Sequence, residues 1–361
     1  MKRLRGEGGF SLVEMLVATA IVCGAFVVVF QFTASAQRVA RAVPDASDMQ
    51  QRLRVAADAI RRDLLGAGSG FVHGAGAGPL VDYLPPLSPM RLGARKPDPE
   101  LSFFTDRITI LSLPDDGAVV RPAADMAGPA GGIAIDPAAV GCPAAGLCGF
   151  ASGTRSIIVD TSGPGRGYEL FSVTDTTSGL AHGTPDPVFS KPYLAASSRV
   201  AELRQRTYYL DDVTRRLMSY DGYQTDVPLA ENVVLLRFDY FVDASPSAAP
   251  RPPDGEDSCA YAAGSPATPV LADLGVPLLA AATAGLLTDG PACGISPFRF
   301  DADLFRIRRV RVTIRAQVSS GGLRGTGSDF SNPGRGSGGW SYVPDIQVSF
   351  DVTPRNMVPS R

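Results

Sequence analysis

The strongest constraint on the fold is an apolar segment near the N-terminus. Between Phe10 and Gln37 the only charged residue is Glu14, and these 28 residues contain no Lys or Arg. A hydrocarbon core about 30 Å thick needs roughly 20 helical residues, so the segment is long enough to cross a membrane. Lys2, Arg3 and Arg5 precede it. By the positive-inside rule the first residues stay cytoplasmic, which predicts an extracytoplasmic body.

The residues at the start of this segment differ from those of an ordinary secretory signal. A secretory signal carries a small-residue cleavage site after its apolar region, whereas Gly8 and Gly9 come before it and Phe10 follows at once. Glu14 stands four residues further on. A carboxylate inside an apolar span costs about 2.5–3.5 kcal/mol on insertion scales, so Glu14 needs a partner. The plain alternative is a tolerated acid near the end of a single-span anchor.

The run GFSLVEMLVATAI resembles the prepilin motif of type IV pilins and of the pseudopilins of type II secretion. The resemblance implies that residues 1–9 are a leader, which a prepilin peptidase removes by cutting between Gly9 and Phe10. Phe10 is then the new N-terminus and is N-methylated. The resemblance also implies that Glu14 pairs with the amino terminus of a neighbouring subunit and so sets the register of helices in a filament.

A helical pattern continues beyond the apolar segment. Apolar residues recur at spacings of four, three, four and four at Met49, Leu53, Ala56, Ile60 and Leu64. Gly66 and Gly68 provide a C-terminal stop. The pattern predicts one helix over residues 10–65, bent near Pro44. Its half at 10–37 is the transmembrane or filament-core part, and its half at 38–66 is amphipathic and packs on the body.

After residue 66 the hydrophobic period changes to two, which is typical of half-buried strands. Cationic side chains alternate with apolar ones around 309–316 and acidic or polar side chains around 345–352, so these two strands are complementary if they pair. The other predicted strands are 107–113, 156–161, 167–173, 199–212, 215–222 and 232–243. We therefore expect an α+β fold in which the helix covers one face of an antiparallel sheet.

Long loops interrupt the strands, as 39 glycines and 30 prolines indicate. The β-rich extracytoplasmic domain at 67–361 has insertions at about 114–153 and 244–298, and a Gly and Ser-rich loop at 319–343. Leucines around 271–279 have roughly helical spacing and predict a short helix inside the second insertion. We expect one continuous body with insertions.

The strands after residue 199 refine the resemblance. The order TYYLDDVTRRLMSYDG, PLAENVVLLRFDYFVD, RIRRVRVTIRAQV and VSFDVTPRN looks like the PilW type of minor pilin and, more distantly, the GspJ-like minor pseudopilins. The resemblance implies a pilin-like fold and a low-copy subunit of the inner membrane and filament tip. The implied partners are the prepilin peptidase, other minor pilins, the major pilin and the inner-membrane assembly platform. A type II secretion pseudopilin, a tip adhesin that binds through its loops and a membrane-anchored enzyme are the alternatives.

The five cysteines divide by compartment. Cys23 lies in the apolar segment, where it acts as a small apolar residue, and the other four lie in the exported body. Three pairings of these four are possible, and local loop closure favours Cys142 with Cys148 and Cys259 with Cys293. A metal site made of the four is the competing interpretation, although paired CxxC spacings are missing.

Other signals of chemistry are weak. His73 and His182 are the only histidines, and neither has a partner fixed by a motif, so we expect no enzyme, no cofactor and no metal. The group Asp254, Glu256 and Asp257 could contact calcium but lacks EF-hand spacing. Several arginines between 306 and 315 could form a basic surface, but a net charge of -2 argues against a nucleic-acid partner.

Overall fold

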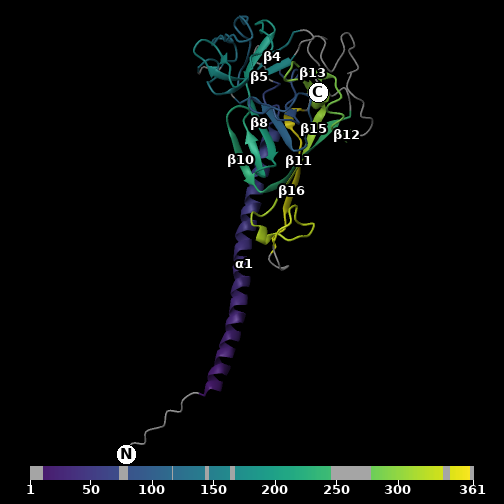
Figure 1. Cartoon of the computed structure of the whole chain (residues 1–361). Coiled ribbons are helices and arrows are strands. Elements are labelled where there is room, and N and C mark those ends of the chain that lie inside the picture. The colour runs from purple at the N-terminus through teal and green to yellow at the C-terminus, as the bar shows by residue number, and fades with distance from the viewer. Residues whose placement is uncertain are drawn as a thin grey trace, which may run out of the picture. The chain divides into compact units, whose positions relative to one another are not determined.

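The computed structural model describes residues 11–72, 80–115, 117–142, 146–162, 167–244, 278–335 and 342–357 (Figure 1). These residues form an α+β fold, in which one long helix is followed by several antiparallel sheets. The chain divides into two compact units, residues 1–51 with 317–345, and residues 52–316 with 346–361. The second unit contains all the sheets and the last turns of the helix.

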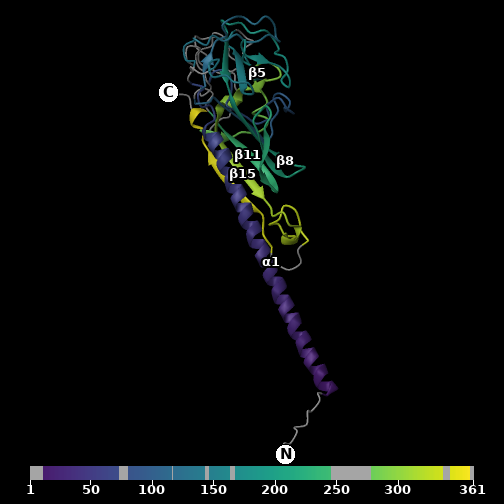
Figure 2. The same ribbon diagram turned by 90° about the vertical axis from the view of Figure 1, so that its left-hand side faces the viewer.

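Helix α1 (Leu12–Leu65) is 54 residues long and continues through Pro44 (Figure 2). Its segment Leu12–Thr33 is long and apolar enough to cross a membrane, by length and composition. The helix ends directly before Gly66, and Gly68 follows in the left-handed region with a φ of 72°, so the predicted stop is confirmed.

The predicted apolar row on the second half of α1 is also confirmed. Leu53 is 1% exposed, and Ala56, Ile60 and Leu64 are fully buried. Two further contacts join these turns to strands. Tyr208 Oη donates to Asp63 Oδ2 at 2.6 Å, and the Arg61 guanidinium lies 5.0 Å from the centre of the Phe350 ring.

The first sheet, called here the β8 sheet, has the order β1-β2-β8-β9-β10. Its strands are β1 (Leu87–Ser88), β2 (Arg107–Ser112), β8 (Arg204–Asp211), β9 (Arg216–Tyr220) and β10 (Asp226–Glu231). Strands β8 and β9 lie within the ranges predicted at 199–212 and 215–222, whereas β10 is not among the predicted strands.

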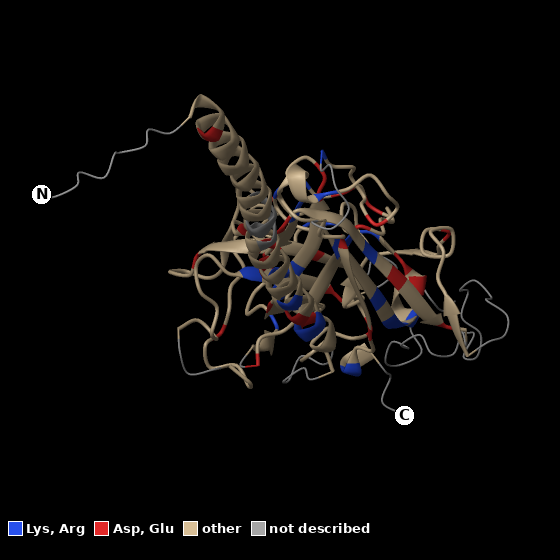
Figure 3. Cartoon of the chain, turned by 90° about the horizontal axis from the view of Figure 1, so that it is seen from below, with Lys and Arg blue, Asp and Glu red and all other residues tan. Residues whose placement is uncertain are grey.

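The β15 sheet has the order β12-β11-β15-β16. It consists of β12 (Leu279–Ala281), β11 (Val233–Asp243), β15 (Ile307–Ala316) and β16 (Ile346–Val352). Strand β16 pairs along its whole length with residues 310–316 of β15, with Arg311 opposite Asp351 and Thr313 opposite Ser349. The predicted complementarity is confirmed, because Arg311 bonds Asp351 through two nitrogens at 2.7 and 3.1 Å; Figure 3 colours the charged positions.

The β4 sheet has the order β3-β7-β4-β5-β6. Its strands are β3 (Val119–Val120), β7 (Ser198–Glu202), β4 (Arg155–Asp160), β5 (Gly167–Asp175) and β6 (Ala181–His182). A two-stranded sheet of β13 (Ala292–Cys293) and β14 (Phe300–Asp301) completes the set, followed by a 3-10 turn, η3, at Ala302–Arg306. Two shorter 3-10 turns are η4 (Gly321–Leu323) and η5 (Arg355–Met357).

Two predicted elements need correction. The single strand predicted at 199–212 is two strands, because the chain leaves the β4 sheet after β7 and enters the β8 sheet with β8. A period-two pattern is the same in two consecutive strands, so it hides the change of sheet. The predicted short helix is not seen at its C-terminal end, where Leu279 begins β12, and residues 271–277 lie outside the described residues.

The insertion at 114–153 is more ordered than a loop. It contributes β3 and several buried side chains to the core of the β4 sheet, among them Met126, Ile133, Ile135 and Phe150. Ile133 also exchanges backbone hydrogen bonds with Leu180 at 3.0 and 2.8 Å. This part of the core was not predicted, because the segment is rich in Ala, Gly and Pro. Its buried apolar residues are spaced irregularly and give neither a helical nor a strand period.

Candidate functional site

The first turn of α1 is a reciprocal capping box. Ser11 N donates to Glu14 Oε2 at 2.9 Å, and Glu14 N donates to Ser11 Oγ at 3.2 Å. Each side chain thus satisfies a backbone N–H that the helix start leaves without a partner. Gly9 and Phe10, the predicted cleavage and methylation positions, lie outside the described residues. The Glu14 carboxylate is held at the N-terminal end of the helix.

The residues after Glu14 expose most of the surface of their apolar side chains. Leu16, Val22, Phe26 and Phe30 are between 51% and 70% exposed, and no residue of Leu12–Thr33 is buried. Cys23 is exposed and free. Exposed apolar surface of this extent fits a single membrane span or a signal segment.

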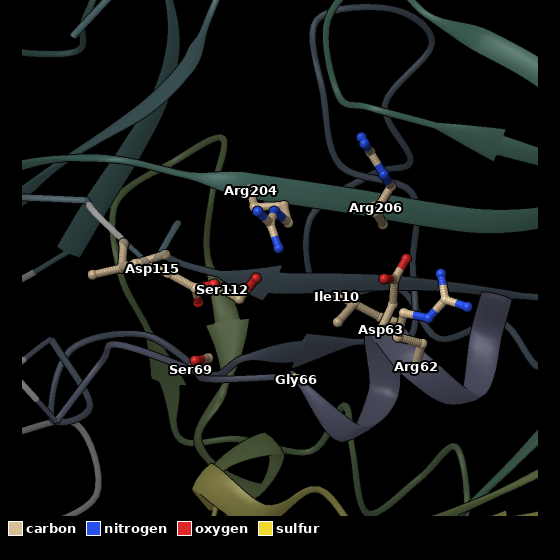
Figure 4. A pocket seen from close by; sticks show the side chains of 10 residues that line it. Arg62, Asp63, Gly66, Ser69, Ile110, Ser112, Asp115, Arg204 and Arg206 are labelled. Atoms are coloured by element: carbon tan, nitrogen blue, oxygen red, sulfur yellow. The ribbon is translucent and has the colours of Figure 1, made fainter. Parts of the chain in front are cut away.

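A cavity of about 210 Å³ lies where α1 ends beside β2 and β8 (Figure 4). Its charged lining residues are Arg62, Asp63, Asp115, Arg204 and Arg206, with Ser69 and Ser112 between them. The Asp63 carboxylate accepts a hydrogen bond from the Tyr208 hydroxyl. Burial, and next the charge of Asp63, raise the pKa of this hydroxyl. In Figure 4 the guanidinium groups of the arginines point apart, so they do not converge on one ligand atom.

An acidic group surrounds η3. Carboxylate oxygens of Asp289, Asp301 and Asp303 lie within 4.8 Å of one another. Protein groups already bind two of them, because Asp301 accepts from Gly290 N at 2.6 Å and Asp303 pairs with Arg306 at 2.8 Å. Burial raises the pKa of Asp303 to about 6, against the opposing effect of Arg306. The arrangement is that of an acidic cluster around a turn, in which Asp301 and Asp303 are buried and Asp289 is exposed.

His182 is the histidine that the structure describes, since His73 lies outside the described residues. His182 Nε2 lies 2.9 Å from the Gly131 carbonyl oxygen and therefore donates to it. The ring packs on Phe189 with a centroid distance of 4.0 Å, and burial lowers the pKa of the imidazole. These contacts indicate that His182 packs against the β4 sheet. No contact of the ring with a nucleophilic side chain is seen among the described residues.

A buried polar network in the β4 sheet was not predicted. Arg155 Nη1 bonds Asp186 Oδ1 at 2.5 Å and Ser172 Oγ at 2.9 Å. Separately, Glu169 accepts from Ser190 and from Tyr193 Oη at 2.7 and 2.9 Å. The partners are 14 to 31 residues apart in the sequence and share no motif, so no sequence signal was available. Each carboxylate is bonded to a protein donor, so the network fits a structural role.

The predicted disulfide between Cys142 and Cys148 is present. Cys293 is also disulfide-bonded. Its predicted partner, Cys259, lies outside the described residues, as do Asp254, Glu256 and Asp257, so that pairing and the calcium alternative stay predictions. The pairing of Cys142 with Cys148 contradicts a single metal site made from all four cysteines of the body.

No family model, no curated protein and no solved structure matches the chain. The functional argument therefore depends on the residues themselves. Of Gly9 and Phe10, predicted for cleavage and methylation, and Glu14, predicted for assembly, the structure describes Glu14 alone and adds Ser11 beside it. The sequence signal for Ser11 was present, because Ser-x-x-Glu before an apolar run is the pattern of a capping box.

Proposed function

We propose that the chain is a minor pilin of the PilW type that takes part in initiating a type IV pilus. The observation that carries the proposal is the sequence Gly9-Phe10 followed by Glu14, placed at the start of a helix that is apolar and exposed over Leu12–Thr33 and buried further on. A helix of this kind anchors a subunit in the membrane before assembly and can pack against other subunits afterwards.

The proposed path begins with prepilin peptidase, which removes residues 1–9 and leaves Phe10 as the methylated N-terminus. The subunit stays in the inner membrane with its β-rich body extracytoplasmic. The assembly platform, the major pilin and other minor pilins then bring further helices beside α1, and this subunit stays near the filament tip.

Glu14 has a direct physical role in this path. Its carboxylate carries a charge inside an apolar segment, where a charge costs about 2.5–3.5 kcal/mol on insertion scales. Within one chain it accepts only the Ser11 N–H among the described residues. A carboxylate has room for further donors, and the positive amino terminus of a neighbouring Phe10 would offset the cost of the charge. Assembly is therefore favoured when helices are in the register that joins these two groups.

The test is a count of surface pili by electron microscopy in a strain that lacks the protein, complemented with variants. Glu14→Val removes both the charge and the cap. Glu14→Gln keeps an acceptor for the Ser11 N–H and removes only the charge, so it is the matched variant. We expect wild type to restore pili and both variants to fail, with normal leader cleavage on immunoblots. Full piliation with Glu14→Gln would contradict the charge-based registration.

The same motif also serves the pseudopilins of type II secretion, so a GspJ-like minor pseudopilin is the second candidate. The deletion strain separates the two. Lost pili with normal protein secretion support the pilin, whereas normal pili with lost secretion support the pseudopilin. Normal pili and normal secretion together would overturn both and direct attention to an adhesin that binds through the insertion at 244–298.

A further inference from the structure

We propose that Asp289, Asp301 and Asp303 bind one calcium ion where β14 meets η3. The site goes beyond the assembly role of α1, because it concerns the body of the subunit. It also differs from the expectation, drawn from the sequence, that the protein has no metal. All three residues belong to the compact unit formed by residues 52–316 and 346–361.

Backbone hydrogen bonds hold the three carboxylates together. Asp301 ends β14, Asp303 lies in η3, and Asp289 lies in the turn before β13. Gly290 N donates to Asp301 Oδ2 at 2.6 Å. Asp303 N donates to Asp301 Oδ1 at 2.8 Å. Both neighbouring segments are therefore fastened to Asp301, and the fold itself brings the carboxylates within reach of one ion.

One buried oxygen of this group lacks a donor from the protein. The Asp303 side chain is 0% exposed, and its Oδ1 accepts from Arg306 Nη1 at 2.8 Å. Asp303 Oδ2 is buried as well, and it has no hydrogen-bond partner among the described residues. Buried polar atoms are normally bonded, because an unsatisfied one costs free energy. A cation in contact with Asp303 Oδ2 would remove this cost.

The charge of the group is also unbalanced. Within the described part of the chain, Arg306 pairs with Asp303, whereas Asp289 forms no hydrogen bond or ion pair. The neighbouring Arg308 has a carboxylate of its own, that of Asp243 at 4.0 Å. Three ionised carboxylates with one guanidinium leave two negative charges. A divalent cation would balance them.

The ligand atoms favour calcium among the divalent cations. All three are carboxylate oxygens, which hard cations prefer to nitrogen or sulfur. Calcium binds oxygens at about 2.3–2.6 Å, so two oxygens on one ion are at most about 5 Å apart. The three oxygens lie within 4.8 Å of one another, which fits this limit. Magnesium demands a near-ideal octahedron with bonds of about 2.0–2.1 Å, whereas calcium tolerates ligands fixed by a turn. Asp289 is exposed, so the ion has a path from solvent and room for water ligands.

The test is a calorimetric titration of Ca²⁺ into the full-length chain in detergent, after treatment with a chelator. Asp289→Asn is the decisive variant, because it removes a ligand charge from an exposed side chain that bonds no other described residue. Asp212→Asn is the matched control, since Asp212 is exposed in the turn between β8 and β9. We expect one ion per wild-type chain, with a Kd of about 10⁻⁴–10⁻³ M, the range of extracellular calcium modules. Binding should be about tenfold weaker or more in Asp289→Asn and unchanged in Asp212→Asn.

A triple variant separates this site from the other acidic group that could contact calcium. Asp254→Asn, Glu256→Gln and Asp257→Asn together should leave the affinity unchanged. Loss of binding in the triple variant with normal binding in Asp289→Asn would place the ion in that other group and overturn the proposal.

Three further results would also overturn the calcium site: no Ca²⁺ binding by the wild type, equal weakening in Asp212→Asn and Asp289→Asn, or Mg²⁺ binding as tight as that of Ca²⁺. Asp303→Asn is less decisive, because it weakens the partner of a buried Arg306 and can unfold the turn. The titration does not depend on piliation, so its outcome is independent of the role of Glu14.

Discussion

Two sheets of this protein use the same kind of ion pair in opposite surroundings. In the β15 sheet, Arg311 and Asp351 bond each other across the outer face, with side chains 47% and 35% exposed. In the β4 sheet, Arg155 and Asp186 bond each other with side chains 4% and 1% exposed. Exposed pairs contribute little because water and salt screen them, whereas a buried charge depends on its partner. We therefore expect the two pairs to differ in what they contribute to stability.

The buried pair is also incompletely satisfied. Arg155 Nε and Nη2 have no hydrogen-bond partner among the described residues, although both are buried. Asp186 accepts from Ser172 N through its other oxygen at 2.8 Å, so one carboxylate holds both the guanidinium and the backbone of β5. Removing Asp186 would therefore leave Ser172 N without this acceptor and the Arg155 guanidinium without its carboxylate, with only the bond from Nη1 to Ser172 Oγ remaining.

The largest expected effect is from Asp186→Ala. Breaking a buried pair from one side typically costs 3–5 kcal/mol, because the remaining charge is neither solvated nor paired. We expect a loss of about this size in the free energy of unfolding, measured by urea unfolding of the full-length chain in detergent. The double variant Arg155→Met with Asp186→Leu removes both charges and should recover most of the loss. A change below about 1 kcal/mol in Asp186→Ala would contradict the comparison.

The second prediction concerns the disulfide next to the same core. Cys148 is 2% exposed and packs with the β4 sheet core, and its bond to Cys142 closes a loop with a sequence separation of 6. Chain-entropy arguments give about 2 kcal/mol for so short a loop. The pair Cys142→Ser with Cys148→Ser should accelerate proteolysis within 114–175, with Cys23→Ser as the control. Equal rates in both variants would mean that the core holds this insertion without the bond.

The third prediction uses pH to separate the sheets. Burial lowers the pKa of His182 below its ordinary value of 6.5, so on acidification the unfolded chain binds a proton before the folded one. Stability of the β4 sheet should therefore fall as pH decreases through 6.5. Hydrogen bonding from Arg311 lowers the pKa of Asp351 below 3.8, so the β15 sheet should lose stability only as pH falls from about 4.

Amide hydrogen exchange at pH 7 and 5.5, corrected for intrinsic rates, measures this difference. His182→Gln retains a donor for the Gly131 carbonyl and removes the titration. We expect the variant to keep its protection in β4 and β5 at the lower pH. The same pH-dependent loss in wild type and variant would assign the effect to another group.

The two sheets also differ in how far the sequence predicts them. The β15 and β16 strands alternate Arg and Asp with apolar residues over a long period-two run, so their faces and their complementarity follow from local pattern. The Arg155–Asp186 pair joins positions 31 residues apart through a loop, and only the folded chain brings them together. Local periodicity specifies faces, whereas buried networks depend on tertiary geometry.

The same distinction applies to the candidate site. Glu14 and the apolar segment follow from a short motif, and the Ser11 cap is encoded three residues away. The position of β16 at the edge of its sheet could not be predicted, because period two reveals a strand but not its neighbours. The wrong prediction of a single strand at 199–212 has the same cause. The chain passes from the β4 sheet to the β8 sheet at Leu203, and the hydrophobic pattern does not change there.

The smallest expected effect is from Arg311→Ala on the outer face of the β15 sheet. In this variant the Asp351 carboxylate still pairs with Arg309, whose Nε lies 3.8 Å from it. Both of these side chains are partly exposed, so the substitution leaves no charge buried without a partner. We expect a shift in the urea midpoint much smaller than that of Asp186→Ala, and it should vanish in about 1 M salt, where the screening length is about 3 Å. Thr313→Ala, which removes the neighbouring bond to Ser349 at 3.1 Å, is an uncharged control that should show no salt dependence. A loss of stability in Arg311→Ala that matched the loss in Asp186→Ala and persisted in high salt would mean that the exposed pair strongly stabilises the β15 sheet. The exposed fraction of the side chains would then not explain the difference expected between the two ion pairs.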